Sequence, residues 1–288
     1  MSLIVSLALA GLLAASGADD AVAIKSGFAP VAVPTLYYES SGQGDAIVLI
    51  HGGQMDRRMW DRQFSTLAKE HQVVRYDVRG YGQSPAAIMP YSDDDDLVAL
   101  LDHLHVAKAH LVGLSLGGRI SLDFALTHPE RVRSIVLVGP GMSGFDWSKE
   151  SQQSFMAVVN AIQRDGPQRA VEMWLKDPYM VPAMEHADIA PRLRELATDN
   201  MRAWLSNDGL ARTIDPPAAK RLKSVRVPTL VIVGGRDVPD IQRIVERISR
   251  EVPGAKKVVI EGAGHIVNME KPDDFDRVLS EWLSKKSR

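Results

Sequence analysis

The chain has 288 residues, 45% of them hydrophobic and 24% charged, which are the proportions of a globular protein. Its formal net charge of −2 supplies no basic field for nucleic-acid binding, and the basic residues at 285–288 are interpreted as a solvated chain end. The absence of cysteine excludes disulfides, thiolate metal ligands, a cysteine nucleophile and lipidation at cysteine.

The first eighteen residues differ in composition from the rest. Residues 3–15 form an almost unbroken apolar run, and the small residues Ser16 and Ala18 suit a signal-peptidase cut after Ala18. We therefore predict a signal peptide over residues 1–18 and a periplasmic or secreted protein without stable membrane insertion after processing, since the run is shorter than the roughly 20 residues of a membrane span. No Lys or Arg precedes the run, so the alternative is a buried N-terminal strand or helix of a cytoplasmic protein.

Short apolar runs recur along the remaining chain, with helix-like stretches between most of them. Residues 19–34 are assigned to a linker, and the run at residues 46–51 suits a central strand covered on both faces. Strands are predicted at residues 35–39, 46–51, 72–76, 110–114, 134–138, 229–233 and 257–260, and helices at residues 59–71, 97–104, 116–128, 239–251 and 275–284. This alternation predicts an α/β fold with a mostly parallel, doubly wound sheet, built from residues 35–140 and 227–288.

Residues 141–226 interrupt the alternation. They contain no convincing strand, but amphipathic helical patterns occur at residues 152–164, 168–175 and 191–205. We predict a helical cap over one end of the sheet. Its Trp147 and Trp174, together with its methionines, suit an adaptable apolar substrate pocket, although plain core packing accounts for them equally well.

The run Ser92 to Asp96 contains four consecutive aspartates. Such a run suggests a cation site. It is better explained as the capped start of a helix, where carboxylates meet unpaired amides and the positive end of the helix dipole.

A candidate nucleophile lies between a predicted strand and a predicted helix. Gly113-Leu114-Ser115-Leu116-Gly117 has the G-x-S-x-G pattern, in which a sharp strand-to-helix turn exposes the serine hydroxyl at the sheet edge. The helix N-terminus behind Ser115 offers free amides to a developing negative charge. Ser115 is therefore predicted to be a catalytic nucleophile.

The partners of such a serine follow in the expected order, acid and then histidine. Asp237 ends one strand and loop, and His265 follows the next strand and a glycine loop, 28 residues later. Because both positions are at the same ends of neighbouring strands as Ser115, we predict a Ser115–His265–Asp237 triad. Asp240 is the alternative acid, although it belongs to the next predicted helix.

A predicted oxyanion hole completes this site. His51-Gly52-Gly53-Gln54 follows the strand at residues 46–51, and its small residues let a backbone amide approach a reacting carbonyl. The amides of Gly53 and Leu116 are predicted as the two donors, each contributing roughly 3–4 kcal/mol to barrier lowering. Gln54 is an equally possible partner for Leu116 by sequence.

With these residues in place, the chain after about residue 33 resembles the α/β-hydrolase superfamily. Residues 76–84 are similar to the family's loop after its fourth strand, and residues 129–132 to the segment before the sixth. Met59-Trp60 and the His51 loop are similar to capped esterases, enol-lactonases and C–C bond hydrolases, which places Trp60 near the substrate pocket. Ser115 argues against the related haloalkane dehalogenases and epoxide hydrolases, which place an aspartate there.

The sequence therefore predicts a serine hydrolase that cleaves a small-molecule carboxylic ester or lactone through an acyl-enzyme. No cofactor or metal is required, and no metal-spaced ligand set is visible. The alternatives are a C–C bond hydrolase of vinylogous diketones that uses the same residues, and a ligand-binding protein on a hydrolase scaffold. The oligomeric state is not determined by any sequence pattern.

Overall fold

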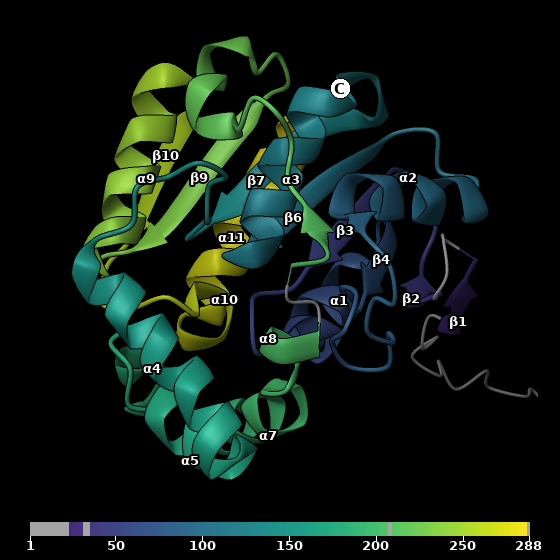
Figure 1. Cartoon of the computed structure of the whole chain (residues 1–288). Helices are drawn as coiled ribbons and strands as arrows, with labels where there is room; N and C mark the ends of the chain where they lie inside the picture. Colours follow the sequence, from purple (N-terminus) through teal and green to yellow (C-terminus); the bar gives the residue numbers. More distant parts are fainter. Residues whose placement is uncertain (1–22, 31–34, 207–208, 287–288) are drawn as a thin grey trace, which may run out of the picture.

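A computed structural model describes residues 23–30, 35–206 and 209–286 (Figure 1). The predicted signal peptide, residues 1–18, lies outside the described residues. In the described part of the chain, no helix is both long and apolar enough to cross a membrane.

One eight-stranded sheet organises the chain, in the order β1-β2-β4-β3-β6-β7-β9-β10. Strands β3, β4, β6, β7, β9 and β10 are parallel, whereas β2 pairs antiparallel with both β1 and β4. The strands are β1 Lys25–Ala29, β2 Leu36–Ser41, β3 Ala46–Ile50, β4 Gln72–Tyr76, β6 Ala109–Leu114, β7 Val132–Val138, β9 Thr229–Gly234 and β10 Lys256–Ile260. The prediction of a mostly parallel α/β fold is confirmed.

Strand β1 corrects the assignment of residues 19–34 to a linker. Its partner β2 pairs with it over five residues, from Lys25 opposite Ser40 to Ala29 opposite Leu36. The strand lies at the edge of the sheet and most of its side chains are exposed. Its backbone hydrogen bonds to β2 hold it in the sheet. Because this pairing does not require buried side chains, the sequence of β1 has no alternating apolar pattern from which a strand could be predicted.

Helices cover both faces of the sheet. In Figure 1, α3 crosses β6 and β7 on one face together with α2, and α11 packs against β7 from the other face. The helix α1 joins α11 there, where the Trp60 and Phe275 rings lie 5.9 Å apart. The core helices and 3₁₀ turns are η1 Arg57–Trp60, α1 Asp61–Leu67, α2 Asp93–His103, α3 Leu116–Thr127, η2 Pro129–Arg131, α9 Pro239–Glu251, α10 Val267–Glu270 and α11 Pro272–Lys286.

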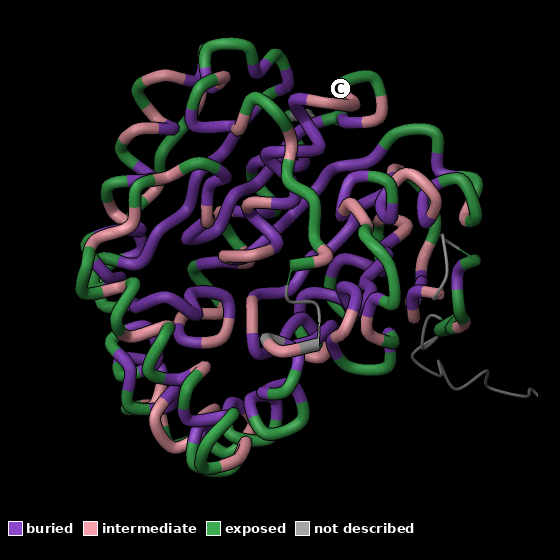
Figure 2. The backbone as a smooth tube through the Cα atoms, in the orientation of Figure 1, coloured by how far each residue is buried: buried purple, intermediate pink, exposed green. Residues whose placement is uncertain are grey.

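The hydrophobic core lies along the central strands. Every residue of β3, β6 and β9 is buried, whereas the edge strand β10 begins with exposed Lys256 and Lys257. Figure 2 shows this contrast between buried strands and exposed outer helix surfaces. Lysines on an edge strand discourage pairing with another chain.

A group of helices lies beyond the carboxyl ends of the parallel strands (Figure 1). It comprises α4 Lys149–Asp165, α5 Pro167–Trp174, α6 Val181–Met184, α7 Ala190–Asn200 and α8 Ala203–Ser206, and we call it the cap. The end of the predicted cap, residues 209–226, instead returns along the core. There, the two-residue strand β8 Ala211–Arg212 pairs with β5 Tyr91–Ser92, and the turns η3 Ala218–Lys220 and η4 Leu222–Ser224 contact α3 and α9.

Candidate active site

Ser115 lies in a strained turn between β6 and α3. Its φ of 53° and ψ of −104° are unusual for a residue with a side chain. Glycine is needed on either side, because a Cβ on Gly113 would lie 2.1 Å from the Gly117 carbonyl oxygen, and a Cβ on Gly117 would lie 2.2 Å from the Ile50 carbonyl oxygen. The close packing of strand, turn and helix therefore accounts for the G-x-S-x-G pattern.

The backbone of Ser115 is anchored to the neighbouring strand and the loop after it. Its amide donates to the Val138 carbonyl at 2.9 Å, and its carbonyl accepts from the Gly141 amide at 2.9 Å. These bonds hold the strained turn, so the conformation that exposes the hydroxyl is built into the sheet edge.

His265 and Asp237 are brought together from the ends of β10 and β9. The His265 Nδ1 atom lies 3.0 Å from Asp237 Oδ2 and 3.1 Å from Oδ1, and both side chains are buried. Gly139 makes room for this pair, because a Cβ there would lie 3.0 Å from the Asp237 carboxylate and 3.1 Å from His265 Nδ1. With Nδ1 donating to the carboxylate, Nε2 is left as the proton acceptor.

Glu270 is a supporting residue that the sequence analysis missed. Its carboxylate accepts from the amides of Gly264 and Ile266, at 2.7 and 2.8 Å, and so clamps the backbone on both sides of His265. Burial raises the pKa of Glu270, and the two hydrogen bonds lower it. The effect of burial is larger, so the pKa lies above its usual value. The only indication of this role in the sequence is the position of a glutamate five residues after His265.

The loop His51 to Gln54 forms another wall of the site. His51 is fully buried, with Nδ1 2.8 Å from the Gly52 carbonyl and Nε2 accepting from the Val78 amide at 2.9 Å. Burial lowers the pKa of His51, which agrees with a neutral ring that donates through Nδ1. Gln54 has a φ of 54° and is buried.

Leu116, the other predicted oxyanion donor, occupies the first position of α3. The amide there has no carbonyl four residues earlier within the helix to bind, so it remains available to an anion. Gly53, Gln54 and Leu116 all line the same cavity as Ser115. The structure thus places both candidate donors of the loop around the same cavity as Ser115, the predicted nucleophile.

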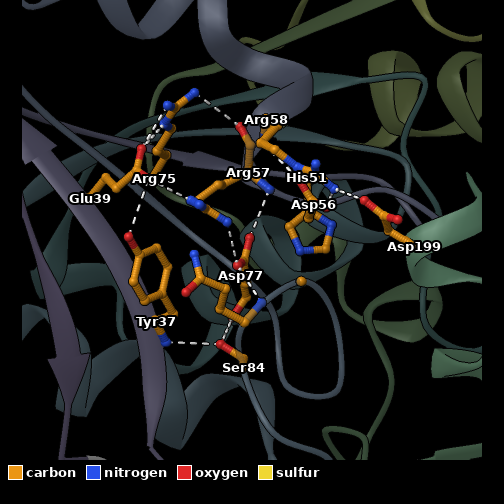
Figure 3. A network of polar contacts seen from close by, with 12 residues as sticks. Tyr37, Glu39, His51, Asp56, Arg57, Arg58, Arg75, Asp77, Ser84 and Asp199 are labelled. Carbon is orange, nitrogen blue, oxygen red and sulfur yellow. Dashed lines mark hydrogen bonds and ion pairs between the residues drawn. The ribbon is translucent and has the colours of Figure 1, made fainter. Parts of the chain in front are cut away.

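A network of buried ion pairs lies next to His51, the first residue of the His51 to Gln54 loop (Figure 3). Arg57 donates to Glu39 and to Asp77 at 2.8 Å each, and Arg75 binds the other oxygen of Glu39 at 2.8 Å. Such pairs hold their side chains in one arrangement, because separating them would leave a buried charge without a partner.

The same network reaches the cap. Arg58 contacts Asp56 on the core and Asp199 on α7, at 2.6 Å each (Figure 3), and the Asn200 amide donates to Asp56 at 2.8 Å. Burial by itself would raise the pKa of Asp56, but the hydrogen bonds from Arg58 and Asn200 lower it to about 2. Asp56 is therefore a charged junction between core and cap.

Ser115 and His265 line one cavity of about 240 Å³ under the cap. The predicted pocket residues Trp147 and Trp174 are also in its wall, whereas the structure places Trp60 elsewhere. Trp60, the last residue of η1, is fully buried, because its ring packs against that of Phe275 in α11. Met142, one of the methionines of the predicted cap, lines the cavity as well, and the side chains there that the sequence analysis missed include Met55, Tyr81, Arg119, Phe155 and Tyr179.

Asp240, the alternative acid, is engaged away from His265. Its oxygens accept from the Ser148 amide at 2.9 Å and from Arg243 at 2.5 Å, at the start of α9. The geometry favours Asp237 as the orienting carboxylate.

The aspartate run at residues 93–96 begins α2. Ser92 caps the helix through the amides of Asp94 and Asp95, at 3.2 and 3.4 Å. Asp93 and Asp96 pair with Arg119 and Arg79, respectively. Among the described residues, no group of three His, Asp or Glu side chains is arranged to hold a metal ion.

Comparison with known proteins extends these observations. A protein of Pseudomonas putida, the dihydrolipoyllysine-residue acetyltransferase component of an acetoin cleaving system, is 32% identical over 96% of this chain and 74% of its own length. A 2-hydroxy-6-oxononadienedioate/2-hydroxy-6-oxononatrienedioate hydrolase of Burkholderia vietnamiensis is 28% identical over 87% of this chain and 91% of its own. The structure of a thermophilic esterase from Thermogutta terrifontis, with malate bound, matches with a TM-score of 0.77 and 28% identity, covering 92% of this chain and all of that one.

A family model matches most of the fold described above. Residues 45–272 match the model of the alpha/beta hydrolase fold, a range that includes β3, the Ser115 turn, the cap and the His265 loop. The resemblance stated from the sequence is confirmed. This chain belongs to the alpha/beta hydrolase fold family.

Proposed function

We propose that this protein is a serine hydrolase that cleaves a carboxylic ester or lactone through an acyl-enzyme. The observation that carries the proposal is the shared cavity of Ser115 and His265, with His265 held by Asp237 at 3.0 Å on its far nitrogen. A strained serine, an oriented base and a helix N-terminus around one small cavity are the parts that acyl transfer requires. The similarity to an esterase supports the same reaction type.

In the proposed first step, Ser115 Oγ attacks the carbonyl carbon and its proton passes to His265 Nε2. The Leu116 amide and an amide of Gly53 or Gln54 stabilise the oxyanion. When the tetrahedral intermediate collapses, the bond to the leaving oxygen breaks, and that oxygen takes the proton from His265. Asp237 stabilises the protonated ring between these transfers.

In the second step, His265 removes a proton from water, and the resulting hydroxide attacks the acyl carbon. Collapse of this intermediate breaks the ester bond to Ser115, whose oxygen recovers the proton from His265. The products are a carboxylic acid and an alcohol, or a hydroxy acid when the substrate is a lactone; an enol-lactone gives an enol acid, which tautomerises to a keto acid. Every atom comes from substrate and water, so the proposed reaction uses no cofactor.

The test is turnover of p-nitrophenyl butyrate by the wild type and by Ser115→Ala. The substitution is expected to lower kcat by roughly 10⁶-fold, the scale seen when a triad serine is removed. Ser65→Ala, on the exposed surface of α1, is the matched control and should retain wild-type turnover. Equal turnover in Ser115→Ala and wild type, with unchanged circular dichroism, defeats the proposal.

A second candidate is C–C bond hydrolysis with the same residues, which the similarity to the Burkholderia hydrolase supports. A higher kcat/KM for a vinylogous diketone than for p-nitrophenyl butyrate would favour it. If the protein only binds a ligand, neither substrate should be turned over, even if a fluorophosphonate labels Ser115.

Export of the mature protein remains part of the proposal. It rests on the apolar run at residues 3–15 and the small residues Ser16 and Ala18. Expression of the full chain, followed by sequencing of the soluble protein's N-terminus, should find Asp19 first. A soluble product that begins at Met1 would contradict it.

A further inference from the structure

Tyr179, in the segment between α5 and α6 of the cap, separates two cavities. It lines the catalytic cavity of about 240 Å³ and also a second cavity of about 460 Å³. The second cavity lies between the cap and the start of α9, and its wall includes Ser151, Pro178, Val238 and Pro239. Tyr179 is therefore the residue that the catalytic cavity shares with a larger neighbouring space.

Aromatic packing holds the Tyr179 ring in this position. The ring lies 5.6 Å from Phe155 and 6.0 Å from Trp174, and it meets the His265 ring edge-on at 4.9 Å. Asp177 fixes the backbone, since its carboxylate accepts from the Tyr179 amide at 3.0 Å. Tyr179 is only 5% exposed, and its ring has neighbours on several sides.

The Tyr179 hydroxyl adds little to this packing. It is buried and has no well-formed hydrogen bond, although Ser151 faces it closely enough to affect its titration. A buried hydroxyl without a well-formed hydrogen bond does not stabilise the fold, so the ring has the role of a partition. Phenylalanine at this position would keep the partition intact.

The wall of the second cavity suits an uncharged chain. Pro178, Val238 and Pro239 present carbon surface, and the two buried carboxylates of the wall, Asp177 and Asp240, are engaged. Asp177 binds Ser154, and Asp240 binds both Arg243 and the Ser148 amide. An apolar chain would therefore meet carbon and paired buried carboxylates, whereas the remaining acidic residue of the wall, Glu150, is exposed to solvent.

The catalytic cavity by itself is small. Ligand pockets for drug-sized molecules are roughly 300–1,000 Å³, so the 240 Å³ beside Ser115 favours a short acyl group. We propose that Tyr179 determines substrate length by closing the catalytic cavity off from the second cavity, which accepts the distal end of a longer acyl chain once the ring is removed. This inference rests on the proposed esterase function and adds a specificity-determining residue to it.

The experiment compares kcat/KM for p-nitrophenyl octanoate and butyrate in the wild type, Tyr179→Phe and Tyr179→Ala. The octanoate-to-butyrate ratio is expected to rise by about tenfold or more in Tyr179→Ala, the scale of discrimination that a few methylenes provide. In Tyr179→Phe the ratio should be that of the wild type. In the double variant Tyr179→Ala/Ser151→Phe, the new phenylalanine ring should fill part of the second cavity. The ratio should therefore return toward the wild-type value.

A ratio is used because Tyr179 also touches His265, so the absolute rate of Tyr179→Ala can fall for both esters together. If Tyr179→Ala does not fold, Tyr179→Leu carries the same comparison, since leucine fills part of the ring's volume but is shorter. An unchanged ratio in the folded variant, with butyrate turnover retained, overturns the inference alone. Wild-type protein without Ser115-dependent turnover overturns the proposed function and this inference with it.

Discussion

The side-chain amide of Asn200, in the last turn of α7, donates a hydrogen bond to the carboxylate of Asp56 at 2.8 Å. Its oxygen accepts from the Gly82 amide at 2.7 Å, so one cap residue joins two core loops. Asp56 follows the His51 to Gln54 loop by only two residues. The cap is thereby fastened beside the predicted oxyanion donors.

This junction predicts the behaviour of Asn200→Ala. The substitution leaves the Gly82 amide without its acceptor and removes a donor from the fully buried Asp56, so the free energy of unfolding should fall by about 1–3 kcal/mol. The kcat for ester turnover should also fall, because the loop that carries Gly53 and Gln54 loses support. Urea unfolding and p-nitrophenyl butyrate turnover measure the two effects. Glu195→Gln, which weakens an exposed contact of Arg58, is the control, and an equal effect in both variants would contradict the prediction.

The triad assignment predicts different effects for two neighbouring aspartates. Asp237→Asn should reduce kcat by about 10⁴-fold, because the amide favours the wrong tautomer of His265 and cannot stabilise its protonated form. Asp240→Asn should retain most of the wild-type kcat, since Asp240 binds Ser148 and Arg243 instead. Steady-state kinetics on one ester substrate decide this, and a larger loss in Asp240→Asn would reverse the assignment.

The packing of the Ser115 turn predicts that Gly117→Ala is poorly tolerated. A Cβ would lie 2.2 Å from the Ile50 carbonyl oxygen, so strand β3 and helix α3 must move apart, at a cost of about 2–3 kcal/mol. Turnover should fall as well, since the movement displaces Ser115. Gly27→Ala is the matched control, because its Cβ would meet only the Tyr38 side chain, at 3.5 Å or more. Thermal unfolding of both variants tests the prediction, which fails if the two have the same Tm.

His110 predicts a specific dependence of stability on pH. Burial, with a smaller contribution from the Arg133 cation, lowers the pKa of His110 from 6.5 to about 4. Below about pH 6.5 the unfolded chain binds a proton there that the folded protein does not bind until about pH 4. The free energy of unfolding should therefore fall as the pH decreases through this window, by about 3 kcal/mol from this residue.

Urea unfolding at several pH values checks the contribution of His110. The substitution His110→Gln should remove that part of the pH dependence, whatever its effect on stability at pH 7. His105→Gln, at an exposed position, should leave the dependence unchanged. The same slope in His110→Gln and wild type would show that another group is responsible.

Much of the fold was predictable because buried parallel strands leave a local signal. The apolar run that became β3 is buried on both faces, and the predicted bounds of β4 and α9 are those of the structure. Strand β1 left no such signal, because its side chains are exposed and its stability depends on the backbone of β2. The two-residue strand β8 was missed for the same reason, since it exists through its pairing with β5.

For the site, the sequence by itself determined the candidate chemistry, since Ser115, Asp237 and His265 each follow a recognisable strand at the position that parallel topology requires. Only the tertiary structure decided which side chains surround them. Trp60 was expected near the pocket and packs against α11, whereas Tyr179 and Glu270, which carry no motif, contact His265 or its loop. The physical reason is the distance along the sequence between the interacting residues. A strand-to-helix turn is determined by residues that are neighbours in the sequence, whereas a cavity wall depends on contacts between helices that are far apart in it.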